Sequence, residues 1–241
     1  MIQFQFMMSV IRHMKPLVLL LLLFVGTSLF AQDINQFDAN GKRHGVWRKN
    51  FYQTNQPRYE GQFNHGKEVG VFKFYKLVDK KSVLSATKEF NENDNTALVK
   101  FFSSTGKLIS EGKMDGKAFI GKWVYYHHKT KAIMSIENYN SNGQLNGEKL
   151  VYYENGQLAE KSNYVNGKRE GQSTIYAENG VVLKEFLYKN DELNGISKYY
   201  NNKGQLVAKG TYKNGKKHGI WKYYTDGKLT DKKDFTLKSK H

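Results

Sequence analysis

A short pattern recurs along most of this 241-residue chain and limits what the chain can fold into. Its clearest marker is a glycine that precedes a group of large aromatic residues, and the last four of these glycines are separated by steps of 24 residues. The marker glycines are Gly45, Gly70, Gly121, Gly147, Gly171, Gly195 and Gly219. A repeat of about 20 to 50 residues is typical of proteins in which each unit packs only against its neighbours. The repeat therefore predicts a linear array of units.

The aligned units share the pattern N-G-K-x-x-G-x-W-x-Y-Y-x-x-G-x-L, followed after five residues by Tyr or Phe. The three tryptophans each lie two residues after a marker glycine, and fifteen of the sixteen tyrosines, Tyr52 among them, fall at three positions of the unit. Only Tyr59 falls outside these positions. One degenerate unit fills the wider gap between Gly70 and Gly121, which gives eight units over about residues 38–235. Aromatic residues at such regular positions are expected to be mainly structural.

Each unit is predicted to form a β-hairpin. Asn-Gly or Asp-Gly occurs ten times, and this dipeptide favours the type I′ turn that joins two antiparallel strands. Runs of six to eight residues rich in Tyr, Phe, Trp, Val and Ile lie between the turns, which is the composition and length of β-strands. After the first 31 residues, no stretch has apolar residues at the 3.6-residue spacing of a helix. The fold class is therefore all-β: an elongated, single-layer, twisted antiparallel sheet of about eight tandem hairpins. A half-exposed layer favours tyrosine, which combines a large apolar ring with a polar tip. Because their sites are partly exposed, Trp221→Ala and Tyr224→Ala are expected to cost about 2–4 kcal/mol each.

Units such as "NGKREGQSTIYAENGVVLKEFLY" and "NGKKHGIWKYYTDGKL" resemble the bacterial variant of the MORN repeat. The resemblance covers about residues 38–235 and implies an elongated single-sheet architecture. Bacterial members are often labelled as antitoxin-like components of toxin–antitoxin modules, whereas eukaryotic MORN proteins are associated with membranes and scaffolding. The sequence departs from the pattern at about 76–114, where a degenerate unit and a longer loop are expected.

The first residues have the layout of a secretory signal peptide. Arg12 and Lys15 precede an apolar run that is shorter than the ~20 residues of a membrane-spanning helix, and cleavage is expected after Ala31. Met14 is an alternative start. The protein is thus expected to be exported, periplasmic, surface-associated or secreted, and not membrane-spanning after cleavage. The predicted parts are a signal peptide at 1–31, a short linker at 32–37, the repeats at 38–235 and a basic tail at 236–241.

The chain carries a net charge of +16 and no cysteine. Loss of residues 1–31 removes Arg12 and Lys15 but no acidic residue, which leaves +14. In a cytosolic protein such an excess would suggest nucleic acid. With an export signal, the acidic partners to expect are an acidic protein surface, an anionic lipid or an anionic polysaccharide rather than nucleic acid. The interpretation that the charge pattern favours is that scattered lysines keep a long sheet soluble. The absence of cysteine excludes a disulfide framework and a zinc–thiolate site.

No catalytic motif is found in the sequence, so the protein is predicted not to be an enzyme and to need no cofactor or metal. His127 and His128 are adjacent and would point to opposite faces of a strand, and His44 and His218 occupy a repeat position. The acidic residues are dispersed, with no pair at general acid–base spacing.

The favoured function is a protein-interaction scaffold in the cell envelope. Binding of an anionic envelope polymer or of lipid head groups is the first alternative, and an antitoxin-like or immunity-like role is the second. Aromatic residues are enriched in binding hot spots, and lysines recur beside the turns. The candidate binding residues are the aromatics Trp47, Trp123, Trp221, Tyr125, Tyr199 and Tyr223 and the lysines Lys117, Lys168 and Lys216.

Overall fold

The computed structural model describes residues 33–236. The predicted signal peptide and the residues after 236 in the predicted basic tail lie outside this range. Within it the chain forms β-strands joined by turns, with no helix. The strands are β1 (Gln36–Phe37), β2 (Arg43–Asn50), β3 (Pro57–Asn64), β4 (Lys67–Val78), β5 (Lys81–Phe90), β6 (Thr96–Phe102), β7 (Leu108–Asp115), β8 (Ala118–Tyr126), β9 (Ile133–Tyr139), β10 (Gly147–Tyr152), β11 (Leu158–Val165), β12 (Lys168–Arg169), β13 (Gly171–Tyr176), β14 (Val182–Lys189), β15 (Glu192–Leu193), β16 (Gly195–Tyr200), β17 (Leu206–Lys213), β18 (Lys216–Thr225) and β19 (Lys228–Asp234).

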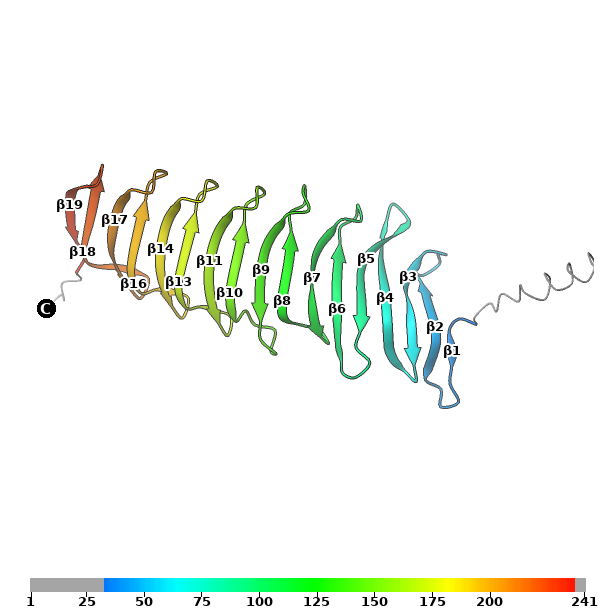
Figure 1. Ribbon diagram of the computed structural model, residues 1–241. Helices are drawn as coiled ribbons and strands as arrows, with labels where there is room; N and C mark the ends of the chain where they lie inside the picture. The colour runs from blue at the N-terminus through cyan, green and yellow to red at the C-terminus, as the bar shows by residue number, and fades with distance from the viewer. Residues whose placement is uncertain (1–32, 237–241) are drawn as a thin grey trace, which may run out of the picture. The chain divides into compact units, whose positions relative to one another are not determined.

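The strands follow one another in chain order as a single antiparallel layer (Figure 1). The two-residue strands β12 and β15 extend the pairing of β11 and β14, which also pair with β13 and β16. The layer therefore contains eight repeated hairpins in the described range, as the sequence predicted. They are β2–β3, β4–β5, β6–β7, β8–β9, β10–β11, β13–β14, β16–β17 and β18–β19.

The segment at 76–114 differs from the longer loop that the sequence predicted. Most of it is strand, because β4 and β5 pair as far as Val78 and Lys81 and are closed by a two-residue turn. The degenerate unit is also regular: Ala97 takes the marker-glycine position and pairs with Met114. Where β3 pairs with β4, β7 with β8 and β17 with β18, the register shifts beside the marker glycine, whereas β5 and β6 pair without a shift. Without that shift the chain needs no residue with positive φ there, so the glycine is dispensable.

The Asn-Gly and Asp-Gly dipeptides form more than one kind of turn. Both residues have positive φ, as a type I′ turn requires, only in the three dipeptides that begin at Asn166, Asn214 and Asp226. In four others the glycine alone has positive φ, and its N–H donates to the carbonyl three residues earlier. This is the longer loop in which a type I turn precedes a left-handed residue. The prediction of a uniform type I′ turn was therefore wrong, although every dipeptide supplies a glycine with positive φ.

One face of the layer holds the buried aromatic residues; we call it the aromatic face, and the other the opposite face. Phe72, Trp123 and Trp221 are at most 2% exposed although no second layer covers them. Each ring lies directly over a glycine of the preceding hairpin, namely Gly61, Gly112 and Gly210. A Cβ atom on these glycines would lie 2.2–2.5 Å from the nearest ring atom. The missing side chain thus makes room for the ring.

This pairing of a large residue with a small one varies along the layer. At the junction of β14 and β16 the order is reversed, because the register sets Phe186 beside Ser197. At the junction of β9 and β10 the pair is Glu137 and Lys149, whose charged atoms lie 2.8 Å apart. The residues that face each other at a junction between neighbouring units are therefore complementary in size or in charge, and the pair differs from one junction to the next.

The start of the layer is covered by the segment predicted as a linker. The N–H of Asn35 donates to the carbonyl of Val46 over 2.9 Å, and the indole N–H of Trp47 donates to the carbonyl of Gln36 over 3.0 Å. Phe37 sets its ring edge-on to Trp47 with centroids 5.1 Å apart. Gln36 and Phe37 form β1, so part of the predicted linker is a strand that caps the exposed edge of β2.

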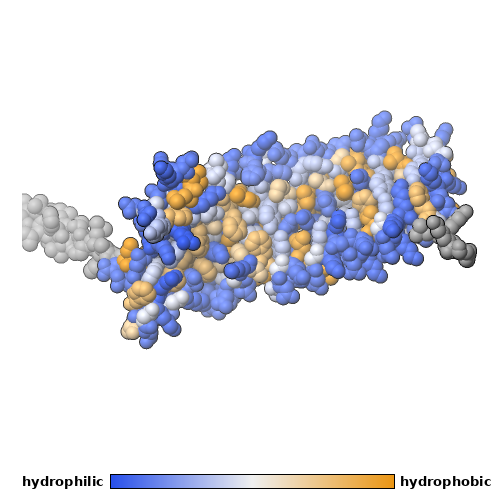
Figure 2. All heavy atoms as spheres, turned by 180° about the vertical axis from the view of Figure 1, so that it is seen from behind, coloured by the Kyte–Doolittle hydropathy of each residue, from blue (hydrophilic) through white to orange (hydrophobic). Residues whose placement is uncertain are grey.

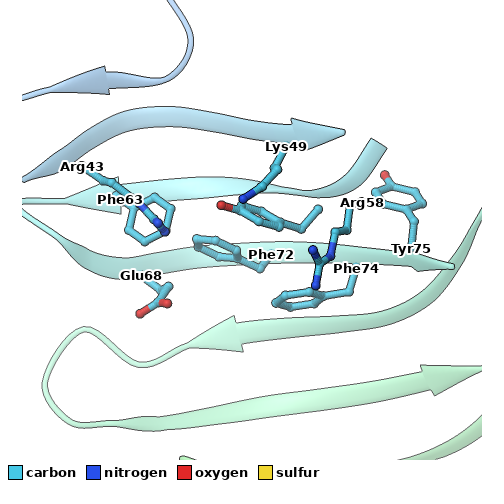
Figure 3. Close-up of a pocket in the computed structure, with 9 residues that line it drawn as sticks. Arg43, Lys49, Arg58, Phe63, Glu68, Phe72, Phe74 and Tyr75 are labelled. Carbon is cyan, nitrogen blue, oxygen red and sulfur yellow. The ribbon is translucent and has the colours of Figure 1, made fainter. Parts of the chain in front are cut away.

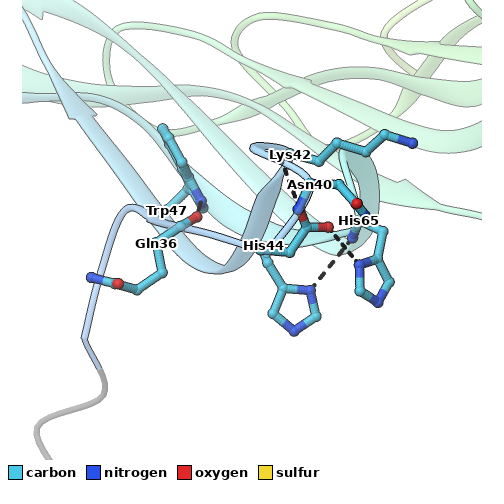
Figure 4. Close-up of polar contacts among 7 residues, drawn as sticks. Gln36, Asn40, Lys42, His44, Trp47 and His65 are labelled. Atoms are coloured by element: carbon cyan, nitrogen blue, oxygen red, sulfur yellow. Dashed lines mark hydrogen bonds and ion pairs between the residues drawn. The ribbon is translucent and has the colours of Figure 1, made fainter.

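Asp38 holds this cap in place through contacts with Asn40, Lys42 and His65, which Figure 4 labels. Its carboxylate accepts hydrogen bonds from the backbone N–H groups of Asn40 and Lys42, both at 2.9 Å, and lies 2.6 Å from Nδ1 of His65 in the β3–β4 turn. The hydrogen bond with His65, and then those from the backbone, lower the pKa of Asp38 to about 2.

The cap is expected to loosen in acid. A carboxyl group whose pKa is lowered by folding stabilises the native state above its ordinary pKa, and this stabilisation is lost as the pH falls from about 4 to about 2. The NMR signal of the Trp47 indole N–H should shift over this range, and Asp38→Asn should give the shifted signal already at neutral pH. A signal that stays constant in both proteins would contradict the proposed fastening.

Candidate binding surfaces

Two of the predicted binding residues are core residues. Trp123 and Trp221 are 0% and 1% exposed, and their indole N–H groups donate to the carbonyls of Lys113 and Thr211. The prediction that they contact a partner was therefore wrong, as was the partly exposed site expected for Trp221. The reason is the glycine across the strand, which lets each ring sink onto the backbone. Trp47 is half-buried beneath the capping segment.

The predicted tyrosines are half-buried, and their hydroxyl groups have partners within the chain. The hydroxyl of Tyr125 lies 3.3 Å from that of Tyr139, and that of Tyr199 lies 3.0 Å from that of Tyr212. Burial raises the pKa of both Tyr125 and Tyr199. The ammonium group of Lys217 donates to Tyr223 over 3.3 Å. These side chains join neighbouring strands. Tyr52, by contrast, was wrongly assigned to a repeat position: it lies in the β2–β3 loop and is 88% exposed.

Sequence reasoning missed the residues that cover the aromatic rings. They lie two positions before the marker glycine. Phe119 stacks on Trp123 with centroids 3.9 Å apart, whereas Lys217 sets its ammonium group 4.2 Å from the ring centre of Trp221. Arg43 lies over Trp47 at 5.0 Å, and Arg169 lies over Tyr188 at 4.3 Å. The basic residues interleaved with aromatics thus make cation–π contacts within the chain. Their fixed spacing from the glycine could have revealed this role.

The predicted lysines Lys117, Lys168 and Lys216 are exposed at the turns that connect successive hairpins. Because every connection of this kind lies on the same long edge of an antiparallel layer, the three lysines share that edge. Neighbouring units are about 10 Å apart along the layer. The structure therefore spreads these lysines along an edge and does not bring them together with the aromatic residues.

A denser group of lysines lies on the opposite face near the C-terminal end. Lys209 pairs directly with Lys222, and Lys222 pairs directly with Lys232, across β17, β18 and β19. All three are exposed, and none forms an ion pair with any described residue. Like charges directly across a pair of strands destabilise a sheet. This arrangement therefore costs free energy in the isolated protein.

Exposed aliphatic side chains lie beside these lysines on the same face. Ile220 precedes Trp221 and so points away from the aromatic face, and Ile196 lies two residues before Lys198 on β16. They are 59% and 50% exposed, and Leu187 on β14 is also exposed. We call these three residues together with Lys209, Lys222 and Lys232 the lysine–aliphatic patch.

A carboxylate borders the patch at β14. Glu185 accepts hydrogen bonds from the ammonium group of Lys198 and the hydroxyl of Tyr200, at 2.9 and 2.7 Å. These contacts, that of Lys198 first, lower the pKa of Glu185. Lys198 is thus neutralised, and the uncompensated charge begins at Lys209.

The space-filling view shows how polarity is distributed over one side of the layer (Figure 2). Apolar residues gather along its middle, and hydrophilic residues dominate both long margins. No group of three or more His, Cys, Asp or Glu residues that could hold a metal is found within 33–236. In the same range no helix is long and apolar enough to cross a membrane.

Comparison with known families agrees with this geometry. A family model described as MORN repeat variant matches residues 145–166, 169–190 and 193–214. Each match covers one of three consecutive hairpins, from β10–β11 to β16–β17. No curated protein matches the sequence significantly. The chain therefore contains three consecutive MORN repeat variants at residues 145–214, within a continuous layer of hairpins of the same kind.

Proposed function

We propose that this chain is an exported, non-enzymatic scaffold that binds the acidic surface of a partner protein through the lysine–aliphatic patch. The observation that carries the proposal is the direct pairing of Lys209, Lys222 and Lys232, whose ammonium groups form no ion pair with any described residue. An acidic partner would remove the repulsion within this row. The row would then contribute to binding rather than only reduce stability.

The exposed aliphatic residues favour a protein as the partner. Protein interfaces combine an apolar centre with a polar rim, and Ile196 and Ile220 supply exposed apolar surface next to the lysine row. A flexible anionic polymer would use the charges but would gain little from these side chains. Export is supported by the predicted signal peptide, and the charge of +14 that remains after its removal suits an acidic partner.

A site-specific crosslinker tests the proposal. A photoreactive benzoylphenylalanine at Ile220 in the full chain is exposed to light in an extract of the native cell envelope. We expect a protein adduct of discrete mass, because Ile220 lies in the patch. The charge-reversing variant Lys209→Glu/Lys222→Glu/Lys232→Glu should reduce this adduct about tenfold or more, because charge pairs at interfaces contribute strongly to affinity.

The matched control reverses three lysines outside the patch. The variant Lys117→Glu/Lys168→Glu/Lys216→Glu changes the net charge equally and should keep the adduct. Equal loss in both variants would show that total charge alone matters, and no loss in either would show that the patch is not used. If the patch lysines instead govern binding to phosphatidylglycerol vesicles and no protein adduct forms, the surface faces a membrane and the proposal of a protein partner is wrong.

A further inference from the structure

A pocket of about 400 Å³ lies over β2, β3 and β4, at the other end of the layer from the lysine–aliphatic patch (Figure 3). Arg43, Lys49 and Arg58 line it together with Tyr59, Phe74 and Glu68. The ring of Phe72 lies in its floor, between the basic side chains. The volume falls in the range that is usual for small-molecule sites.

The pocket occurs where the first hairpin departs from the repeat. In later hairpins the residue four positions after the marker glycine is usually aromatic and faces a small one, as in the pairs Tyr125 with Ser135 and Tyr199 with Ala208. In the first hairpin Lys49 takes the aromatic position and Tyr59 takes the small one. Tyr59, like Tyr52, falls outside the repeat pattern of the other tyrosines. Because both positions of this pair differ from the later hairpins, the ammonium group of Lys49 and the ring of Tyr59 line the same pocket.

The basic residues of the pocket are not neutralised by acidic ones. Elsewhere on the sheet lysines form ion pairs, as Lys73 does with Glu60 at 3.7 Å and Lys149 does with Glu137 at 2.8 Å. Among residues 33–236 no ion pair involves Arg43, Lys49 or Arg58. The guanidinium group of Arg43 lies over the ring of Phe63 at 5.1 Å, which holds it at the edge of the pocket.

We propose that this pocket binds an acidic saccharide, with a uronic acid unit as the recognised group. Guanidinium groups match a carboxylate with two parallel hydrogen bonds, and Arg58 is exposed and free to do so. The half-buried rings of Tyr59 and Phe74 offer a flat apolar surface for the C–H groups of a sugar ring.

Glu68 distinguishes a saccharide from a simple anion. It lines the pocket, is exposed and forms no ion pair with any described residue. Its carboxylate can accept hydrogen bonds from sugar hydroxyl groups, whereas it repels the oxygens of a phosphate. Three cations and one carboxylate therefore suit a ligand that carries both a carboxylate and hydroxyl donors. This site lies outside the lysine–aliphatic patch, so its existence does not depend on the proposed protein partner.

Calorimetric titration of the full chain with the tetramer of galacturonic acid tests this assignment. We expect binding that weakens with added salt, and no binding of the neutral glucose tetramer. Arg58→Gln should weaken binding at least about tenfold, because it removes a charge-assisted contact. Lys73→Gln removes one charge from the opposite face of β4 and serves as the matched control, for which affinity should not change.

A second variant restores the repeat pattern. Lys49→Tyr/Tyr59→Ala reproduces the pair that Tyr199 and Ala208 form on β16 and β17, so it should fold and should abolish binding. Equal binding of the neutral tetramer, or tighter binding of inorganic phosphate or adenosine monophosphate, would overturn the assignment to an acidic saccharide. Binding that neither Arg58→Gln nor the double variant weakens would show that the pocket is not the site.

Discussion

Trp123→Ala is expected to lower the free energy of unfolding by about 3–5 kcal/mol, the range typical of a large aromatic residue removed from a closed core. The side chain is fully buried, stacks on Phe119 and packs against Val99 and Met114 of the two preceding strands. Its removal opens a cavity and leaves the carbonyl of Lys113 without its indole partner. Urea denaturation followed by circular dichroism measures the loss.

The effect should also be local along the chain. Each hairpin contacts mainly its neighbours, so amide hydrogen exchange should accelerate most in β6–β9 and least in the last hairpin. Lys122→Ala, which truncates an exposed side chain on the opposite face of the same strand, should change stability by no more than about 0.5 kcal/mol. Similar losses in the two variants, or uniform acceleration of exchange, would contradict a core confined to the aromatic face.

Gly210→Phe is expected to cost about 3 kcal/mol or more, because it overpacks a closed site. A Cβ atom at this position would already lie 2.2 Å from Cδ2 of Trp221. Gly210 does not have a positive φ, so the clash with the ring, and not backbone strain, sets the cost. Thermal and urea unfolding of the variant measure it.

Adding Trp221→Ser to Gly210→Phe should recover much of this loss. The double variant places Phe between Ser197 and a new serine, as Phe186 lies between Ser173 and Ser197 in the native chain. A double-mutant cycle should therefore give a favourable coupling of about 1–3 kcal/mol. Gly210→Phe combined with Ile220→Ser on the opposite face serves as the control and should show no recovery. Additive losses at positions 210 and 221 would show that the two residues are not matched in size.

The sequence was sufficient for the hairpins because their determinants are local. Each Asn-Gly or Asp-Gly lies next to the strands that it joins or starts, and the aromatic residues recur at the spacing of the unit. The turn types were harder to predict from the sequence, since a glycine with positive φ occurs both in a two-residue turn and in a longer loop. The degenerate unit was expected to be irregular, yet strand pairing on both sides holds Ala97 in a regular conformation.

The candidate binding surface was harder to predict from the sequence than the hairpins, because it depends on contacts between strands. The burial of Trp123 and Trp221 follows from Gly112 and Gly210, which lie eleven residues earlier in the chain and were not recognised as their partners. The row of Lys209, Lys222 and Lys232 exists only in the register that the bulges create. A shift of one residue would turn these lysines to the other face.

Hydroxyl-radical footprinting of the full chain tests most directly the claim that the aromatic face is a packed core around Trp123 and Trp221, while the lysine–aliphatic patch on the opposite face is open for binding. We predict that Trp123 and Trp221 are oxidised much more slowly than Trp47, while Ile196 and Ile220 react as exposed residues. Addition of poly-L-glutamate as an acidic probe should protect Ile196 and Ile220 and leave Trp123 and Trp221 unchanged. Rapid oxidation of Trp123 or Trp221, or protection of these rings by the probe, would contradict the account.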